Sequence, residues 1–347
     1  MPYSNIDKPS KYFNTVTWTG TGSAMSITGV GFQPDWVWYK GRSFGYNHGL
    51  FDAVRGTTNF LKSNATDAEA TVSGVTAFNS DGFSLGTDAG GVGSGNTFVA
   101  WNWLGANSTV SNTSGSITST VSANTTAGFS IVSYTGNATN GATVGHGLSS
   151  PPQMVITKGR GSADAWQILT NIYHNYSEGD FIYLDTTDAK ANSVNVSFLP
   201  TSTTWQMKSG QAGNTAITKI AYCFHSVKGF SKFGSYTGNG SADGTFVYTG
   251  FKPAFLIVKR YNDAGYDWLM YDNKRQVEFN VVDDFLKPNL SDAETTGNAN
   301  QSLDFLSNGV KFRGSGASSN GSGASYIYMA FAENPFVSSK GLPTTAR

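Results

Sequence analysis

Short apolar runs alternate with clusters of Gly, Asn, Ser and Asp along the whole chain. Many of these runs alternate apolar and polar positions, as in Phe13–Thr19, and they are rich in aromatic and β-branched residues. Runs of this kind, bounded by turn-forming residues, are typical of β-strands. Lysine- and glutamate-rich segments that would form the surface of helices are missing. The pattern therefore predicts an all-β fold.

The first part of the chain shows the pattern most clearly. An Asp-Gly step at Asp81-Gly82 separates two alternating runs, which is a strong signal for a β-hairpin. The run Asp35–Lys40 carries bulky residues on both faces, so we expect a central strand that is buried on both sides. Further strands are expected at Phe13–Thr19, Ala24–Thr28, Leu50–Arg55, Phe60–Ser63, Val75–Asn79, Phe83–Leu85 and Thr97–Leu104. This number of strands in one segment predicts an antiparallel β-sandwich of the jelly-roll or lectin-like kind.

The same order of landmarks recurs three times, and internal repeats decide the architecture of a chain. Lysines that close the third strand recur at Lys40, Lys158 and Lys259. The other aligned positions are Leu61, Leu184 and Leu286, and then Ala100, Ala221 and Ala330. We therefore expect three tandem β-sandwich repeats.

The landmarks and the composition together predict the domain boundaries. The 347 residues exceed the usual size of one domain. We expect an N-terminal arm over residues 1–10, repeats over 11–106, 129–226 and 229–337, and a C-terminal tail over 338–347. Residues 107–128 consist mainly of Ser, Thr, Asn, Gly, Ala and Val, which is typical of a linker.

The residues shared by the repeats are mostly those that a fold needs. Gly20, Gly136 and Gly238 end the first strand of each repeat, where we expect backbone angles that a β-carbon would resist. The shared lysine is followed by Arg42, Arg160 or Arg260. These cations either line a binding groove or pair with a carboxylate on the next strand, such as Asp52 or Asp272, and we favour the structural ion pair.

Two repeats share an acidic loop, at Asp67–Glu69 and Asp292–Glu294. A solvated turn is the simpler interpretation of this loop. Calcium ligation is the weaker alternative, because calcium requires a denser cluster of oxygen atoms.

Composition excludes several classes of function. The net charge is zero, which argues against nucleic acid as the main partner. The single cysteine, Cys223, excludes an intrachain disulfide framework. We find neither the pattern of a secretory signal peptide nor an apolar run that could span a membrane, so we expect a soluble protein made in a reducing compartment.

No catalytic, cofactor or metal motif stands out. The histidines at 48, 146, 174 and 225 lack the spacing of metal ligands. The run Gly90–Gly95 lacks the Lys-Ser/Thr of a phosphate-binding loop, so we interpret it as a hairpin loop. We therefore expect no catalytic, cofactor-binding or metal-binding residues and no cofactor.

Aromatic residues in loops suggest surface recognition instead. Aromatic side chains on the loops of a β-sandwich are suited to stacking on a sugar ring or docking on another protein. The candidate recognition residues are Tyr46, His48, Tyr173, Tyr176 and Tyr266.

With the repeats laid out, the chain resembles a family of tail-fibre-like structural proteins from bacteriophages of marine bacteria. The resemblance covers essentially the whole chain. It rests on the segments 12–15, 29–38, 51–56, 80–86, 99–103, 234–240 and 343–347. It implies a virion protein with lectin-like β-sandwich modules on the outside of the particle, and it implies no catalytic residues.

These observations predict a virion structural protein, assembled in the host cytoplasm, that forms a tail fibre or appendage and contacts the host surface without covalent chemistry. A capsid decoration protein on the head is the alternative, and a polysaccharide-degrading enzyme is the third and least favoured. The expected partners are other virion proteins and a host glycan or protein. Fibres are commonly symmetric oligomers, so a homotrimer is expected.

Overall fold

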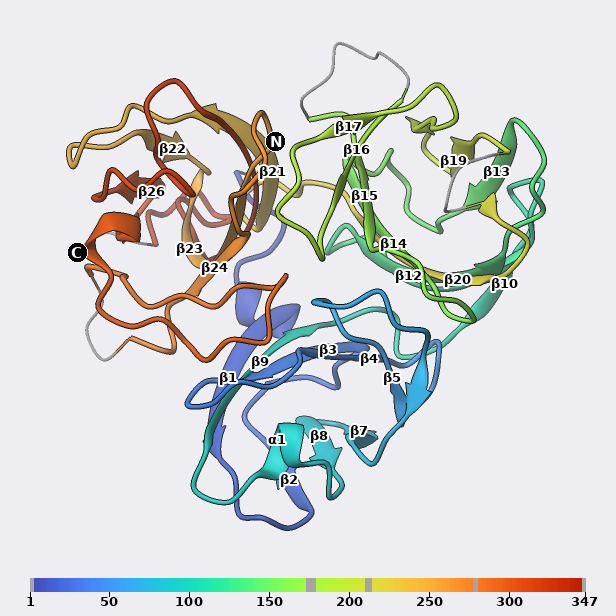
Figure 1. Cartoon of the computed structure of the whole chain (residues 1–347), viewed down its shortest axis with the longest axis horizontal. Helices are drawn as coiled ribbons and strands as arrows, with labels where there is room; N and C mark the ends of the chain where they lie inside the picture. Colours follow the sequence, from blue (N-terminus) through green and yellow to red (C-terminus); the bar gives the residue numbers. More distant parts are fainter. Residues whose placement is uncertain (1–2, 173–178, 210–213, 277–279, 345–347) are drawn as a thin grey trace.

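The computed structural model describes residues 3–172, 179–209, 214–276 and 280–344. The fold is all-β, with several antiparallel sheets and very little helix. Figure 1 shows three lobes around a common centre, which we call the first lobe (residues 11–106), the second lobe (107–226) and the third lobe (229–337). None of the helices in the described part of the chain is long and apolar enough to cross a membrane.

An inner array of four strands with one strand order occurs in each lobe: the first strand, the last strand, and then the two strands of a hairpin. In the second lobe this array is extended at both ends into an eight-stranded sheet. The inner arrays are β1 (Phe13–Thr19)-β9 (Thr97–Trp103)-β3 (Trp36–Gly41)-β4 (Gly49–Asp52), β12 (Phe129–Thr135)-β20 (Thr218–Phe224)-β14 (Met154–Gly159)-β15 (Gln167–Thr170) and β21 (Ser231–Thr237)-β27 (Ser325–Pro335)-β23 (Phe251–Arg260)-β24 (Leu269–Asp272). The strands that extend the second array are β10 (Val110–Asn112), β11 (Ser119–Asn124), β16 (Asp180–Tyr183) and β17 (Ala191–Asn192).

An outer sheet of three strands accompanies each inner array. The outer sheets are β2 (Met25–Ile27)-β8 (Gly82–Leu85)-β7 (Val75–Asn79), β13 (Ala142–Gly145)-β19 (Thr204–Met207)-β18 (Leu199–Pro200) and β22 (Phe246–Tyr248)-β26 (Gly309–Phe312)-β25 (Leu303–Leu306). The remaining elements are the pair β5 (Asn59–Phe60)-β6 (Ala70–Thr71), one helical turn α1 (Ala89–Val92), and the 3-10 turns η1 (Pro9–Lys11) and η3 (Ala299–Gln301).

The two faces of each inner array pack against different cores. On β3, Val37 and Tyr39 join a cluster that also contains Ile27 and Phe83 of the outer sheet. The alternate residues, Trp36 and Trp38, belong instead to a cluster at the centre of the molecule. Successive side chains of a strand point to opposite faces, so one strand contributes to both cores. All six residues of β3 are buried, which confirms the prediction of a central strand covered on both sides.

The central cluster contains residues from all three lobes. Trp36 of the first lobe stacks on Tyr222 of the second, with ring centroids 4.1 Å apart. Phe224 of the second lobe lies 6.2 Å from Phe331 of the third, which in turn lies 5.7 Å from Trp103 of the first. The inner arrays therefore bury one face against the other lobes, so apolar burial joins the three lobes into one body.

Each strand expected in the first lobe forms, although β4 and β5 are shorter than expected and β6 was not predicted. The hairpin at Asp81-Gly82 forms between β7 and β8, as expected. The Asp81 carboxylate accepts hydrogen bonds from the backbone N–H groups of Gly29 and Gly31, which ties the hairpin to the neighbouring turn.

Two segments differ from the prediction. The expected linker, residues 107–128, contains β10 and β11, and β11 pairs along its whole length with β12. Ile117, Val121 and Ala127 are buried there, so three apolar residues in a polar segment anchor it to the body of the protein. In the Gly-rich run Gly90–Gly95, expected to be a hairpin loop, α1 forms one helical turn instead.

In the third lobe, the counterpart of Ala100 and Ala221 is not Ala330, as expected, but the residue two positions earlier. Ala100 and Ala221 each lie opposite the residue before the shared lysine on the central strand. In the third lobe Tyr328 lies opposite that residue, two positions before Ala330. A shift of two residues keeps each side chain on the same face of a strand, so the apolar pattern could not reveal it.

The three strand-ending glycines have a different reason from the one expected. None of them has a positive φ angle. A β-carbon at Gly20, Gly136 or Gly238 would instead lie 2.1–2.4 Å from a carbonyl oxygen of the loop that leads into the last strand of the same inner array. Close approach of two backbone segments therefore requires glycine here.

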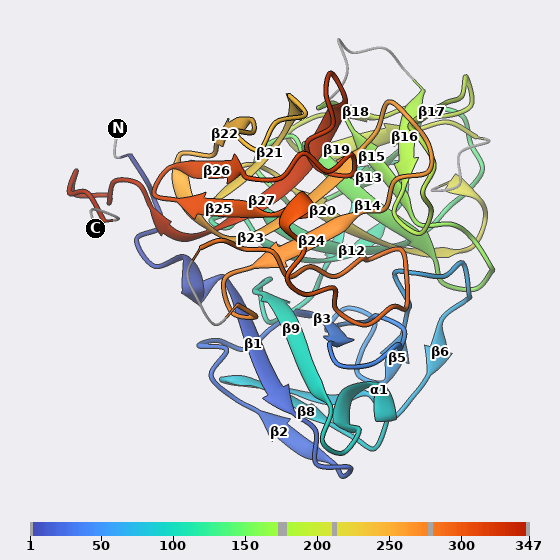
Figure 2. The same ribbon diagram turned by 60° about the vertical axis from the view of Figure 1, so that its left-hand side comes forward.

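Both terminal segments lie beside the third lobe (Figure 2). In the N-terminal arm Ser4 and Ile6 are buried. Asp7 accepts a hydrogen bond from the backbone N–H of Ser339 at 2.7 Å. The described part of the arm is therefore docked on the body.

Candidate functional site

The junction between the first and second lobes is built around Glu69. Its Oε1 atom lies 2.7 Å from Arg160 Nη2 of the second lobe, and its Oε2 atom accepts from both Arg160 Nε and Arg55 Nη1 at 3.0 Å. Arg55 is fully buried and also pairs with Asp52 at 2.5 Å. Tyr222 of the second lobe donates its hydroxyl proton to Asp52 at 2.8 Å. Two carboxylates and two guanidinium groups thus compensate one another across this junction.

The third lobe contacts the first lobe in the same way through Glu294. Its Oε2 atom lies 2.8 Å from Arg42 Nε, and its Oε1 atom accepts from Arg275. Arg275 pairs with Asp272 at 2.6 Å, and Asp272 accepts from the indole N–H of Trp101 at 2.9 Å. Trp101 occupies the place of Tyr222, so the donor differs while the arrangement of charges is the same.

The junction between the second and third lobes keeps the backbone contact and changes the charges. Lys190 replaces the glutamate, and its backbone N–H donates to Tyr261 O at 2.8 Å. At the other two junctions Glu69 N donates to Arg160 O and Glu294 N donates to Arg42 O, also at 2.8 Å. The Lys190 side chain pairs with Asp180 of its own lobe at 2.6 Å. The three junctions therefore run in one rotational sense and close a ring.

The three shared lysines are buried at these junctions. Lys158 Nζ donates to Thr66 O of the first lobe at 2.7 Å, and Lys259 Nζ donates to Tyr266 O at 2.7 Å. Lys40 Nζ donates to Gly41 O at 2.8 Å. Burial lowers the pKa of each of the three lysines to about 8. They pair with backbone carbonyl groups and do not line an open groove.

The structural interpretation of the shared arginines was right in kind, but its expected partners were wrong. Arg42 and Arg160 pair with glutamates of neighbouring lobes, whereas Asp52 and Asp272 pair with Arg55 and Arg275. Arg260 pairs with Asp263 at 3.0 Å. The partner of each of the first two arginines comes from another lobe, so spacing within one lobe could not identify it.

The acidic loops are partly solvated turns and partly junction contacts. Asp67 and Asp292 are exposed, whereas Glu69 and Glu294 are engaged by arginines. Over the described ranges, no three His, Cys, Asp or Glu side chains gather as a group that could hold a metal ion.

His48 was expected on the surface, and this expectation is wrong. Its side chain is fully buried. Nδ1 accepts the indole N–H of Trp38 at 2.9 Å, and Nε2 lies 3.0 Å from Lys287 O of the third lobe. A carbonyl oxygen only accepts, so Nε2 carries the proton and the ring is neutral. Burial lowers the pKa of His48 well below its usual value, which agrees with this tautomer.

His48 and two tryptophans hold equivalent places at the three junctions. The indole N–H of Trp166 donates to Lys62 O of the first lobe at 2.7 Å. The indole N–H of Trp268 donates to Tyr183 O of the second lobe at 2.9 Å. Each of these side chains therefore donates to a carbonyl group of the preceding lobe in the ring, and His48 belongs to the architecture of the junction.

The tyrosines of the predicted recognition loops lie half-buried next to junctions. Tyr46 donates its hydroxyl proton to Asp88 at 3.1 Å, and its backbone N–H donates to Ser291 O of the third lobe. The ring of Tyr266 lies 4.1 Å from the Arg260 guanidinium. Both rings are therefore partly occupied by contacts within the protein. Tyr173 and Tyr176 lie outside the described residues.

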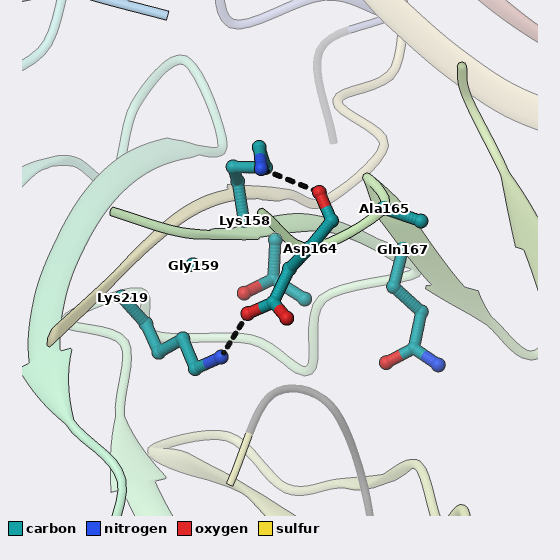
Figure 3. Close-up of a pocket in the computed structure, with 7 residues that line it drawn as sticks. Lys158, Gly159, Asp164, Ala165, Gln167 and Lys219 are labelled. Atoms are coloured by element: carbon teal, nitrogen blue, oxygen red, sulfur yellow. Dashed lines mark hydrogen bonds and ion pairs between the residues drawn. The ribbon is translucent and has the colours of Figure 1, made fainter. Parts of the chain in front are cut away.

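A small pocket lies in the second lobe beside β14, β15 and β20, and Figure 3 shows its lining residues. The space between its walls is about 160 Å³, part of which is open solvent, and it leaves essentially no room for a water molecule. It is lined by Thr157, Lys158, Gly159, Asp164, Ala165, Gln167 and Lys219. Pockets that bind small molecules usually have about 300–1,000 Å³. The pocket is therefore too small for a typical ligand.

The amino groups in this pocket already have partners. Lys219 Nζ lies 3.1 Å from Asp164 Oδ2, and Lys158 Nζ donates to Asp164 O and to Thr66 O. Burial lowers the pKa of Lys219. An amine with a lowered pKa can act as a nucleophile or a base, but both amines here are tied to oxygen atoms of the protein. The arrangement is therefore that of a structural ion pair.

The aromatic strand β22 is not among the segments that the sequence predicted for surface recognition. Phe246 and Tyr248 are 43% and 49% exposed, whereas Val247 between them is buried. The alternation Phe-Val-Tyr was a signal in the sequence, because the outer positions of an edge strand face solvent when the middle one joins the core.

Neither the curated proteins nor the solved structures include a protein that matches this chain. One family matches residues 8–335, which cover all three lobes and the three junctions. The chain therefore belongs to the family described as Domain of unknown function (DUF7483).

Proposed function

We propose that the protein is a bacteriophage virion component, a tail fibre or appendage subunit that contacts the host surface by non-covalent binding. The observation that carries the proposal is the closed ring of three lobes, with a shared apolar centre and buried junctions. The ring holds the outer loops and edge strands of the three lobes at fixed relative positions. Because these segments are already ordered, less conformational entropy is lost when a partner binds. The resemblance of the sequence to tail-fibre-like proteins supports the same role.

Within this proposal the three lobes are tandem β-sandwich repeats. The shared strand order and the equivalent backbone contacts at Glu69, Lys190 and Glu294 support this interpretation. Function then belongs to the places where the lobes differ, since the residues that they share form the fold.

A capsid decoration protein is the second candidate. The ring of three similar lobes favours it, because such a ring matches the symmetry of a threefold position in a shell. Both candidates act by binding and without catalysis, and both bring the protein into contact with other virion proteins.

Electron microscopy of intact particles labelled with an antibody against the protein separates these candidates. Label at the tail or its appendages is the expected result, and label over the head would replace the fibre proposal by the decoration proposal. Purified particles without any label would contradict both. Release of reducing sugar from host envelope glycans, lost when a carboxylate of the chain is substituted, would contradict a role in binding alone.

The homotrimer remains part of the proposal and has a separate test. Analytical ultracentrifugation of the purified chain is expected to give three times the mass of the monomer. A monomer at all concentrations would remove the trimer from the proposal without affecting the location on the particle.

A further inference from the structure

The outer face of β22 is unlike the corresponding face of the other two lobes. Strand register aligns buried Val247 with Ile27 of β2 and Val144 of β13. The position of Phe246 is then held by Ser26 in the first lobe and Thr143 in the second. A sandwich of this type therefore forms with polar residues at this place, and the aromatic residues are not required by the fold.

The position of Tyr248 shows the same contrast. Thr28 and Gly145 are its counterparts in the first and second lobes. Phe246 and Tyr248 are two residues apart on one strand, so their rings project from the same side about 7 Å apart. Nearly half of each residue is exposed to water, which is unfavourable for an aromatic ring. A partner that covers the two rings would remove this apolar surface from water.

Hydrogen bonds hold the Tyr248 ring in place. The hydroxyl group of Tyr3 donates to Gly250 O at 3.1 Å, so the 3.0 Å contact between the hydroxyl groups of Tyr3 and Tyr248 uses the proton of Tyr248. Tyr3 also packs on Phe336, with ring centroids 6.3 Å apart. The aromatic surface thus extends from the edge strand onto the docked N-terminal arm. Because these contacts already fix the rings, they lose little conformational freedom when a ligand binds.

Two lysines add positive charge to this surface. Lys232 Nζ lies 5.2 Å from the centroid of the Tyr248 ring and donates to Tyr248 O at 2.6 Å. Lys228 Nζ lies 4.4 Å from the centroid of the Tyr3 ring. Within the described part of the chain neither lysine pairs with a carboxylate, whereas many other cations of this neutral protein do. The surface is therefore complementary to an anionic ligand that also presents flat apolar faces.

We propose that Phe246, Tyr248, Tyr3, Lys228 and Lys232 form a binding surface for an acidic polysaccharide. The apolar faces of successive sugar rings stack on Phe246 and Tyr248, and acidic groups of the chain meet the two lysines. Single-stranded nucleic acid also stacks on aromatic residues, but its binding needs a groove of cations along the backbone. Two lysines on a protein of zero net charge favour the polysaccharide. This inference deepens the proposed recognition of the host surface and rests on it.

The test uses the purified full-length chain and a panel of acidic polysaccharides: alginate, polysialic acid and heparin. Neutral dextran and oligodeoxythymidylate serve as comparisons, and affinity is measured by titration calorimetry at low and high salt. We expect binding to at least one acidic polysaccharide, with an affinity that falls as salt rises, and weaker binding to dextran and to the oligonucleotide.

Matched variants locate the site. Phe246→Ser together with Tyr248→Thr installs the residues that the first lobe carries at these positions, so the fold is expected to persist, which near-ultraviolet circular dichroism checks. The double variant is expected to lose about tenfold or more in affinity. Lys228→Gln with Lys232→Gln is expected to weaken binding mainly at low salt. Val194→Ser, at an exposed site in the second lobe, is the control and should bind like the unsubstituted chain.

Several outcomes would overturn the inference. These are failure to bind any of the three acidic polysaccharides, unchanged affinity in the folded double variant, or tighter binding to the oligonucleotide. Self-association in ultracentrifugation that disappears in the double variant would identify a second copy of the chain as the occupant instead. None of these results changes where the protein is found on the particle, so the inference and the proposed function fail separately.

Discussion

The Glu69 carboxylate of the first lobe receives two hydrogen bonds from the Arg160 guanidinium of the second, at 2.7 and 3.0 Å. Apolar contacts alone allow many relative orientations of two lobes, because they have no preferred direction. The bidentate pair adds hydrogen bonds of defined geometry to this junction. A third hydrogen bond to the Glu69 carboxylate comes from buried Arg55 of the first lobe. Among the ion pairs of the described residues, only Glu69 connects Arg160 to a buried charge of the first lobe.

Removing the Glu69 carboxylate is expected to destabilise the protein strongly. In Glu69→Ala the buried Arg55 side chain keeps only Asp52 as a charged partner, and loss of one member of a buried pair costs about 3–5 kcal/mol. Urea unfolding monitored by fluorescence measures the change. Asp67→Ala in the same loop is the matched control, because its pair with Lys62 is exposed and should contribute within about 1 kcal/mol. Equal losses in the two variants would contradict the assigned role of the junction.

Two buried tryptophans on β3 are expected to respond differently to the same substitution. No group in the described structure accepts from the indole N–H of Trp36, whereas that of Trp38 donates to His48. Trp38→Phe leaves the buried Nδ1 atom of His48 without a donor and should cost about 1–3 kcal/mol more than Trp36→Phe. Thermal or urea unfolding of the pair decides this, and equal costs would show that the hydrogen bond to His48 does not contribute.

Truncation of Trp36 tests the central core. Trp36 is fully buried and stacks on Trp103 and Tyr222, with ring centroids 4.2 and 4.1 Å away. Trp36→Ala should lower the free energy of unfolding by about 3–5 kcal/mol through lost burial and a cavity. A negligible change in the melting temperature would mean that the lobes do not pack through this residue.

His146 is expected to make stability depend on pH. Its Nδ1 atom accepts from Leu148 N–H at 3.1 Å, and its Nε2 atom lies 3.2 Å from Thr201 O, so the ring is neutral in the folded protein. Burial lowers the pKa of His146 to about 4. The unfolded chain binds this proton near pH 6.5, so the stability contributed by His146 is lost as pH falls from about 6.5 to about 4.

The His146→Asn variant isolates this effect. The stability of the unsubstituted protein minus that of the variant should fall by about 2–3 kcal/mol between pH 7 and pH 4.5. The difference is needed because burial raises the pKa of Asp35 and Asp185 to about 6, so these groups stabilise the fold as pH falls through that value. Parallel stability curves for the two proteins would contradict a neutral buried His146.

Local pattern was sufficient for many of the strands. The alternation of Phe13–Thr19 predicted β1 with the bounds that it has, and Asp81-Gly82 located a hairpin. These features depend on residues that are close in sequence. In residues 107–128 the composition was misleading, because three buried apolar residues, Ile117, Val121 and Ala127, outweigh many polar neighbours when a sheet edge is available.

The candidate site was harder to predict because its contacts join different lobes. The burial of His48 depends on Lys287, which is 239 residues away, and the partner of Arg42 is 252 residues away. No periodicity within the sequence of one lobe carries that information. The alternation Phe246-Val247-Tyr248 was readable in the sequence, but the observed register was needed to show that the other two lobes carry small or polar residues at the two aromatic positions.

The closed ring also determines how the protein should unfold. A linear array of repeats has two end units that can fray while the rest stays folded. Here every lobe has two neighbours, because the third lobe returns to the first through Glu294 and Arg42. Releasing one lobe breaks two junctions and exposes the central tryptophans to water. Most of the free-energy cost of unfolding is therefore expected when the first lobe opens. We therefore expect one cooperative calorimetric transition for the three lobes, with no stable form of the protein in which a single lobe has opened.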